Sequence, residues 1–406
     1  MGAGTVRCST ESEFALDSLT RPGRIERPGG RVLEDGPTHA PTGCAAPPAL
    51  PGSYLVVELT NRCSLACVHC SVSEEGHGHH RNTGYLDPLI FDALIDDLID
   101  TGARFGALIL FWLGEPLLHP HFTRIYRRAV RAADEHGTFG QVEVHSNATH
   151  LNADRVRALL NEARVPQVLH LSLDAAGQAV YHAVKGLDRF ERVQTHVTHL
   201  LQEKGRTGAQ WPRVVLQYIV GSNNVDEVGV FRSHWEGVAR AAGLRVRSVA
   251  GHVPSGGDVV VFYRQLDAPT PELQQAENAI FRRAMAEQGL ELPAQAAHGR
   301  TVRAENLASC SGFWKSPVVD WRGSVTVCTR DNLLENGIGS LQEHRFSELW
   351  WGAEMRRRRR SVAKGDYAGL SLCTTCFIPR SLNHTELSTE DIERQEAHDR
   401  SVERVY

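Results

Sequence analysis

The chain has 406 residues, 41% of them hydrophobic, and its 44 basic and 48 acidic side chains leave a net charge of -4. This length allows one large domain with a smaller one, and the hydrophobic content is ordinary for an enzyme with a sizeable core. The nearly balanced charge excludes a global field that would hold nucleic acid or an anionic membrane. We therefore expect neither a nucleic-acid partner nor a membrane partner.

The N-terminal segment has no basic region followed by an apolar stretch, and no apolar run reaches the roughly 18 residues of a membrane span. Seven of the nine cysteines fall into two groups with metal-ligand spacing, while Cys8 and Cys44 lie outside them. Metal-binding thiolates need a reducing compartment, so we expect a cytoplasmic protein. Residues 1–52 are rich in proline and glycine, which predicts an extended arm or a mobile tail.

Short apolar runs alternate with helical patterns over residues 53–250, which is the repetition of a parallel α/β sheet. Six such units are predicted, one helix of which runs from Asp87 to Thr101. The expected strands are Tyr54–Val57, Ala107–Trp112, Gln141–Ser146, Val168–Leu173, Val214–Val220 and Leu244–Val249.

A loop with three cysteines directly follows the first expected strand. Residues 58–70 read ELTNRCSLACVHC and contain Cys63, Cys67 and Cys70. Ligands of α/β proteins bind at this end of a strand. A closed zinc or iron–sulfur site needs four ligands, so three thiolates leave one iron of a four-iron cluster open to a small molecule. The alternative, three core or metal-storage cysteines, does not explain why this spacing follows a strand.

This loop is similar to the signature of the radical S-adenosylmethionine (SAM) superfamily, although His69 replaces the family's usual aromatic or other planar residue. The resemblance implies an α/β fold, a partial (β/α)6 TIM barrel. It also implies that SAM binds the open iron of a [4Fe-4S] cluster and yields a 5′-deoxyadenosyl radical, which takes a hydrogen atom from the substrate. An electron donor such as flavodoxin or ferredoxin is expected as a partner.

The resemblance extends to the ends of the next strands. The turn after the second strand, with Leu113 in place of the family's first glycine, is similar to a motif that contacts the amino group of SAM. Its remaining residues are Gly114, Glu115 and Pro116. Contacts to the ribose or carboxylate of SAM are implied for Ser146, Asn147, Ser172 and Gln217. The alternative is that some of these residues only cap the following helices. Lys185 stands where the family has an arginine, and a contact to the SAM carboxylate is expected from it as well.

Residues 251–308 break the repetition and predict a bridging insertion. A strand-like run covers Val259–Tyr263, and a helix is expected from Thr270 to Gln288, because Thr270 can cap it and Pro271 suits its first position. One face of this helix should pack against another element, since it is apolar at Leu273, Ala276, Ile280, Phe281 and Ala284.

Residues 309–380 carry a second group of cysteines, and residues 381–406 are expected to form a tail. A hairpin is predicted at Arg322-Gly323 and a helix over Phe346–Val362. The four cysteines suit either structural zinc or a fully ligated iron–sulfur cluster. Their spacing resembles the SPASM extension in its shortened one-cluster form, called twitch, which implies an auxiliary [4Fe-4S] cluster. The implied ligands are Cys310, Cys328, Cys373 and Cys376.

A fully ligated cluster cannot bind substrate directly but can accept one electron, which favours an oxidation. An epimerase commonly needs a thiol in its pocket, yet no cysteine occurs between Cys70 and Cys310. The N-terminal segment also differs from the leader-binding domain of peptide-modifying relatives. The whole pattern resembles the aminoglycoside-pathway dehydrogenases of the deoxy-scyllo-inosamine or spectinomycin type.

We therefore expect a radical SAM dehydrogenase of antibiotic biosynthesis that oxidises a secondary alcohol of an aminocyclitol or amino sugar. Amino-sugar epimerisation, dehydration and peptide maturation stay open as alternatives, as does a non-catalytic iron–sulfur scaffold.

Overall fold

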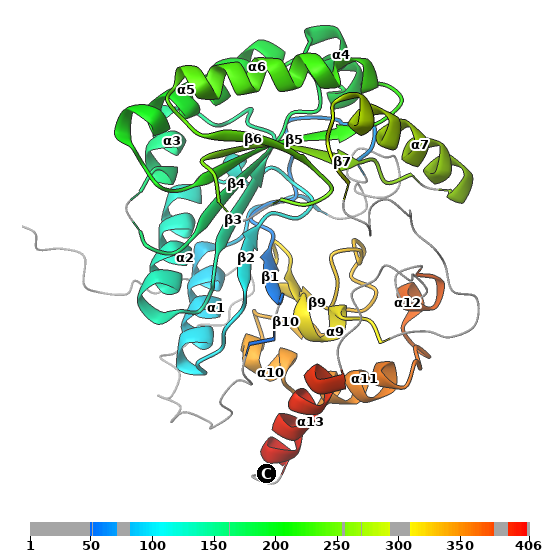
Figure 1. Cartoon of the computed structure of the whole chain (residues 1–406). Helices are drawn as coiled ribbons and strands as arrows, with labels where there is room; N and C mark the ends of the chain where they lie inside the picture. The colour runs from blue at the N-terminus through cyan, green and yellow to red at the C-terminus, as the bar shows by residue number, and fades with distance from the viewer. Residues whose placement is uncertain are drawn as a thin grey trace, which may run out of the picture. The chain divides into compact units, whose positions relative to one another are not determined.

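The computed structural model describes residues 49–50, 52–70, 82–161, 163–253, 256–268, 270–292, 309–376 and 389–403. The expected N-terminal arm lies almost entirely outside these residues, as do Cys8 and Cys44. The described part is organised on one sheet of ten strands in the order β10-β9-β8-β1-β2-β3-β4-β5-β7-β6 (Figure 1). No helix among the described residues is long and apolar enough to cross a membrane.

The barrel part of the sheet is parallel throughout. All six predicted strands are present, and their ends differ from the prediction by no more than one or two residues. The strands are β1 (Tyr54–Val57), β2 (Ala107–Leu110), β3 (Val142–Ser146), β4 (Gln167–Ser172), β5 (Arg213–Val220), β6 (Val246–Ala250) and β7 (Val259–Gln265).

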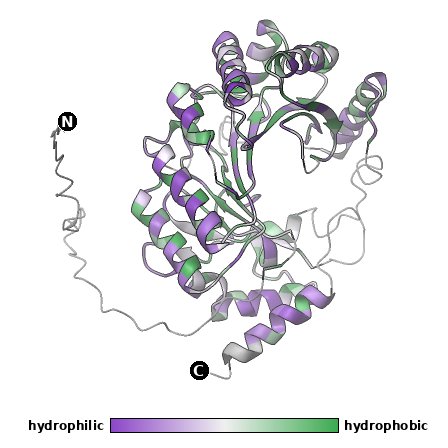
Figure 2. Cartoon of the chain, turned by 60° about the vertical axis from the view of Figure 1, so that its left-hand side comes forward, coloured by the Kyte–Doolittle hydropathy of each residue, from purple (hydrophilic) through white to green (hydrophobic). Residues whose placement is uncertain are grey.

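Helices cover the outer side of these strands, and their hydropathy is mixed because only one face is buried (Figures 1 and 2). The predicted first helix is confirmed: Asp87 accepts a hydrogen bond from the Leu89 backbone N–H at 2.9 Å, and Pro88 takes the first position. The helices are α1 (Pro88–Asp100), α2 (Phe122–His136), α3 (Ala153–Leu159), α4 (Gln178–Lys185), α5 (Phe190–Thr207) and α6 (Val228–Ala241), with short 3₁₀ turns η1 (Pro116–Leu118) and η2 (Val225–Glu227).

The barrel sheet does not end at residue 250. The prediction that residues 251–308 form a bridging insertion was wrong for Val259–Gln265, which is strand β7 of this sheet. This strand pairs in parallel with both β5 and β6, which makes β6 the edge strand. A parallel connection normally needs a dozen or more residues, whereas only residues 251–258 join β6 to β7. The short connection is the reason why this central strand was not predicted as part of the barrel, even though Val259–Tyr263 is a hydrophobic run and is buried.

The helix predicted after β7 is confirmed as α7 (Pro271–Glu287), with Thr270 accepting a hydrogen bond from the Leu273 N–H at 3.3 Å. Its predicted apolar face is buried only toward the C-terminal end, at Phe281 and Ala284. Leu273 is 53% exposed.

The auxiliary part continues the same sheet. Strand β8 (Val318–Val319) pairs in parallel with β1 and antiparallel with β9 (Ser324–Thr326), and Gly323 forms the predicted turn with φ +85°. The remaining elements are β10 (Gly339–Ser340), α9 (Gly312–Lys315), α10 (Phe346–Trp350), α11 (Ala353–Ala363), α12 (Ser371–Thr375) and α13 (Thr389–Glu403).

Two predictions for this part need correction. The expected helix over Phe346–Val362 is broken at Gly352, where a Cβ atom would lie 1.9 Å from the Glu348 carbonyl oxygen. The expected C-terminal tail contains α13, whose Asp391 lies 3.1 Å from the Lys315 ammonium group on α9.

Candidate active site

A cavity of about 880 Å³ opens at the C-terminal ends of the barrel strands, which is within the range of ligand-binding pockets. Its walls come from the three-cysteine loop, from the ends of strands β2 to β5 and β7, and from the loop that follows Cys328. Segments far apart in sequence therefore meet at the position where ligands bind in α/β folds.

The three-cysteine loop is held at the cavity by backbone hydrogen bonds. The Ala66 and Val68 N–H groups donate to the carbonyl oxygens of Lys185 and Val184, each at 3.0 Å. Gly186 allows this contact, because a Cβ atom there would lie 2.1 Å from the Ala66 carbonyl oxygen. Cys63, Cys67 and Cys70 all line the cavity as free thiols, so they could bind three irons of a cluster whose fourth iron faces the cavity.

Seven of the eight residues predicted to contact SAM line the cavity: Gly114, Glu115, Ser146, Asn147, Ser172, Lys185 and Gln217. The eighth, Pro116, is buried as the first residue of η1. Register explains part of this convergence, since Ser172 at the end of β4 lies opposite Gln217 on β5.

Glu115 is the organising residue of this group. Its carboxylate is 2% exposed and accepts hydrogen bonds from the Ser146 hydroxyl at 2.8 Å, the Asn147 N–H at 2.7 Å and the Leu117 N–H at 3.0 Å. Burial raises the pKa of Glu115 to about 7, although these donors oppose the shift. The Asn147 side-chain amide lies 3.5 Å from the Cys63 sulfur, so Glu115 positions the end of β3 against the cysteine loop.

Lys185 does not point a free ammonium group into the cavity. Its Nζ lies 2.5 Å from Asp174 Oδ2 and 3.0 Å from the Ser172 carbonyl oxygen, and both charged side chains are almost fully buried. Burial favours the neutral amine, but the ion pair with Asp174 raises the pKa of Lys185. Lys185 is therefore committed to Asp174, a partner that the sequence analysis did not assign.

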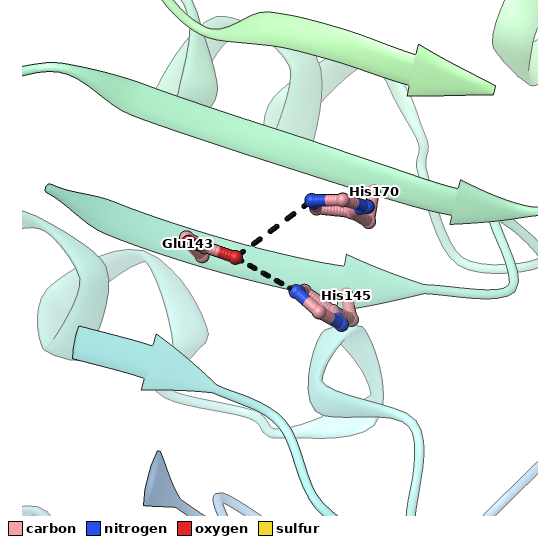
Figure 3. Close-up of side chains that lie close together, drawn as sticks. All are labelled: Glu143, His145 and His170. Carbon is pink, nitrogen blue, oxygen red and sulfur yellow. Dashed lines mark hydrogen bonds and ion pairs between the residues drawn. The ribbon is translucent and has the colours of Figure 1, made fainter. Parts of the chain in front are cut away.

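Sequence reasoning also missed three polar side chains on the inner face of the barrel, Glu143 and His145 on β3 and His170 on β4, which we call the inner triad (Figure 3). Glu143 Oε2 lies 3.0 Å from His145 Nε2 and 3.7 Å from His170 Nε2. Burial, with a smaller contribution from His145, lowers the pKa of His170 to about 3. The missed signal was the alternation of Glu143 and His145 with buried valines on a strand.

The four C-terminal cysteines lie together as a second set of free thiols. Burial and the neighbouring thiols raise the pKa of Cys310 to about 12, and Cys328, Cys373 and Cys376 all contribute. The Cys310 N–H also donates to the Tyr367 hydroxyl at 3.0 Å. Four converging thiols fit a closed metal site, either a fully ligated iron–sulfur cluster or zinc.

The auxiliary cysteines are tied directly to the cavity. Thr329 and Arg330, which follow Cys328, line the cavity wall. The Trp112 indole donates to the Thr329 carbonyl oxygen at 2.8 Å. Buried Glu58 on the cysteine loop accepts a hydrogen bond from the Trp321 N–H at 3.2 Å. This is a second contact between the barrel and the region that carries the auxiliary cysteines.

Comparison with known protein families agrees with this arrangement. Residues 57–227 match the radical SAM superfamily, and residues 310–377 match SPASM, an iron–sulfur cluster-binding domain. The chain is a radical SAM enzyme with a SPASM domain. The expected cofactors are thereby confirmed: SAM, a radical SAM [4Fe-4S] cluster and auxiliary iron–sulfur ligation.

Solved structures with a TM-score of 0.50 or more confirm the fold of the enzyme. Native anSMEcpe with bound AdoMet is 13% identical, with a TM-score of 0.51 over 86% of this chain and 97% of that chain. SuiB from Streptococcus suis bound to S-adenosylmethionine is also 13% identical, with a TM-score of 0.50 over 82% and 77%. BtrN in complex with AdoMet and 2-DOIA is 16% identical over 80% and 92%, with a TM-score of 0.44. Among curated proteins, none matches this chain.

Replacing Gly114 by alanine is expected to weaken SAM binding by at least about tenfold and to destabilise the fold by about 1–3 kcal/mol, as overpacking does. The added Cβ atom would lie 2.1 Å from the Thr60 carbonyl oxygen and 2.7 Å from that of Arg62, so the cysteine loop must move. Calorimetric titration with SAM and thermal unfolding measure both effects.

Gly237 on α6 provides the matched control, since a Cβ atom there meets nothing within 4 Å. Gly237→Ala should leave SAM binding unchanged and stabilise the fold by about 0.5–1 kcal/mol. If the Gly114→Ala variant binds SAM as tightly as the wild type, then SAM binding does not require the close contact between Gly114 and the cysteine loop.

Replacing Asn336 by leucine is expected to lower the reduction potential of the auxiliary cluster. The Asn336 side-chain amide donates to the Cys373 sulfur at 3.3 Å, and such bonds stabilise the more negative reduced cluster. A redox titration followed by electron paramagnetic resonance measures the shift. Asn147→Leu near Cys63 should leave the auxiliary potential unchanged, whereas an unshifted potential in Asn336→Leu would mean that this hydrogen bond is absent from the loaded enzyme.

Proposed function

We propose that this enzyme oxidises a secondary alcohol of an aminocyclitol or amino sugar to a ketone. The observation that carries the proposal is the shared cavity wall, since the three-cysteine loop and the residues after Cys328 line one cavity. A substrate bound there lies between the position of radical formation and an electron acceptor. Epimerisation, by contrast, does not require net electron removal.

In this proposal the three-cysteine loop holds the SAM cluster, and the four C-terminal cysteines hold one auxiliary [4Fe-4S] cluster. When bound, SAM and its cluster supply a carbon radical that accepts a hydrogen atom, and the auxiliary cluster supplies an acceptor for one electron. The alcohol thus loses a hydrogen atom, an electron and its hydroxyl proton, which together balance its conversion to a ketone. Reduced flavodoxin or ferredoxin is the proposed source of the first electron.

The chain's own residues hold the two ligands in place. Glu115 fixes Ser146 and Asn147 against the cysteine loop, and Ser172 and Gln217 continue the same row across the sheet. SAM is expected along this row, so the substrate takes the rest of the cavity.

The remaining cavity wall suits a polar substrate. His145, His170, Arg264, Asp267 and Asn332 all line it, with Arg264 and Asp267 paired at 3.3 Å. Imidazole, guanidinium, carboxylate and amide groups can hydrogen-bond several hydroxyl groups, and a carboxylate also attracts an ammonium group. A small molecule that carries hydroxyl and amino groups therefore fits this wall better than an apolar one.

The sequence also disfavours an epimerase that uses a cysteine thiol as its hydrogen donor. No cysteine occurs between Cys70 and Cys310. The cysteines that line the cavity, among the described residues, all belong to the three-cysteine loop.

Anaerobic turnover in D₂O with a panel of aminocyclitols and amino sugars tests this function. We expect 5′-deoxyadenosine and a product lighter than the substrate by two hydrogen atoms. A product of unchanged composition with one solvent deuterium on carbon would show epimerisation, and a product lighter by one water would show dehydration. If a precursor peptide is converted and none of the sugars reacts, the enzyme is a peptide-maturation enzyme.

A further inference from the structure

The inner triad lies beside the row proposed to bind SAM, and both of its histidines line the same cavity. His145 directly precedes Ser146, and His170 lies two residues before Ser172. The parallel register of β3 and β4 places His145 opposite His170, and their ring centroids are 4.3 Å apart. Two strands therefore bring two imidazoles and one carboxylate together (Figure 3).

His170 has no hydrogen bond that would explain its burial. Its Nδ1 is buried without a partner among the described residues. Its Nε2 lies 3.7 Å from Glu143 Oε2, which is too long for a hydrogen bond. Buried polar atoms are normally satisfied, so this imidazole indicates partners that the protein chain itself does not supply, one at Nε2 beside Glu143 and a separate one at Nδ1.

The spacing of the triad suits a metal ion. The three ligand atoms all lie within 4.8 Å of one another, and Glu143 Oε2 is 3.0 Å and 3.7 Å from the two imidazole nitrogens. Around a tetrahedral zinc ion with bonds of about 2.0–2.1 Å, neighbouring ligand atoms are separated by about 3.3 Å. The two distances from Glu143 Oε2 lie on both sides of this value, and the two imidazole nitrogens lie within 4.8 Å of each other, so modest side-chain shifts would bring all three atoms around one ion.

We propose that Glu143, His145 and His170 bind one divalent metal ion of the zinc class, with an open coordination position toward the cavity. Two imidazoles and one carboxylate are a ligand set for such ions, and three protein ligands leave a position for water or substrate. The open position faces the cavity because both histidines line it, whereas Glu143 does not.

Neighbouring residues hold the triad in the arrangement that a metal needs. The Gln141 side-chain amide donates to Glu143 Oε1 at 2.6 Å, which leaves Oε2 for the ion. Phe111 stacks on the His145 ring with centroids 5.3 Å apart, which fixes the plane of the imidazole. Two cations, Arg213 and Arg264, act electrostatically on His170, so the carboxylate of Glu143 is needed to offset the charge of the ion.

The ion would give the cavity a Lewis acid that coordinates a hydroxyl or amino group of the substrate. This role rests on the proposed function, but binding of the ion does not. The metal site can therefore be tested whether or not an amino sugar is the substrate.

The test uses the enzyme with both iron–sulfur sites reconstituted. It is incubated anaerobically with Zn²⁺ at increasing concentrations and desalted, and zinc and iron are then measured by mass spectrometry. We expect about one zinc atom per chain at unchanged iron content. Glu143→Gln and His170→Asn should weaken zinc binding by at least about 100-fold, a loss at the upper end of that seen when ligand support is removed.

His182→Gln on α4 is the matched control, because this histidine is exposed and does not line the cavity; it should bind zinc like the wild type. Iron content and circular dichroism report whether each variant is folded. The proposal is overturned if the folded wild type binds no zinc or if Glu143→Gln binds zinc equally well. It is also overturned if zinc binds only as iron is lost from the cysteines. Absence of product from amino sugars would refute the proposed function and leave the zinc content unchanged.

Discussion

Replacing Cys373 by alanine is expected to lower the iron content from about eight to about four atoms per chain and to separate SAM cleavage from substrate oxidation. Cys373 is a buried member of the four-thiol set, so its loss removes one of the auxiliary ligands. The three-cysteine loop is untouched, and 5′-deoxyadenosine should still form. The ketone should fall at least about tenfold, because its electron then has no acceptor next to the cavity.

Cys63→Ala is the matched variant for the other cysteine group. It should also lose about four iron atoms, but 5′-deoxyadenosine and ketone should both disappear, since the open iron that binds SAM is lost. Iron analysis and product quantification on the same anaerobic samples check both variants. A Cys373→Ala enzyme that lacks auxiliary iron yet makes ketone at the wild-type rate would contradict the assigned role of the auxiliary site.

Replacing Lys185 by methionine is expected to lower the free energy of unfolding by about 3–5 kcal/mol, because it leaves a buried carboxylate unpaired. Asp174 is fully buried, and Lys185 is only 2% exposed. Asp174 also accepts a hydrogen bond from the Ile219 N–H at 2.6 Å, so it cannot move easily to water. The change should loosen the cysteine loop too, because Ala66 bonds to the carbonyl oxygen of the same lysine.

Denaturant unfolding of the iron-free protein under reducing conditions measures this loss. The double variant Asp174→Asn with Lys185→Met should recover most of the stability, since no unpaired charge remains. Arg206→Ala, which breaks an exposed ion pair with Glu203, serves as the control and should have no measurable effect. If Lys185→Met is as stable as this control, then water or another group compensates for Asp174.

The parts of the fold that the sequence predicted well carry local signals. The apolar run before the cysteine loop forms β1, and the cap at Asp87 marks the start of α1, so each signal lies within a few residues of its element. The place of β7 was missed because it depends on sheet order, and the short connection after β6 resembles a break in the repeat. The stop at Gly352 was missed because the helical pattern continues on both sides of it.

The candidate site shows the same division. Cysteine spacing and the turn at Gly114 can be read from neighbouring residues, and both lie at the cavity. The inner triad depends on the register of two strands, and the pair of Asp174 with Lys185 depends on how α4 returns to the end of β4. Such contacts are set by tertiary structure, so spacing along the chain does not predict them.

One cavity wall joins the two cofactor sites. In the proposed reaction, a radical formed at the three-cysteine loop and an electron acceptor held by Cys328 would both face the same substrate, because Thr329 and Arg330 line the cavity together with that loop. The proposed reaction is therefore removal of a hydrogen atom from the substrate carbon, followed by loss of an electron to the auxiliary site.

Turnover of an amino sugar or aminocyclitol that carries deuterium at the reacting carbon tests this reaction. Mass spectrometry of both products should find the deuterium in 5′-deoxyadenosine and none at the oxidised carbon of the ketone. The amount of labelled 5′-deoxyadenosine should equal the amount of ketone. Deuterium that stays in the sugar product, or 5′-deoxyadenosine that forms without the label while ketone accumulates, would contradict the account.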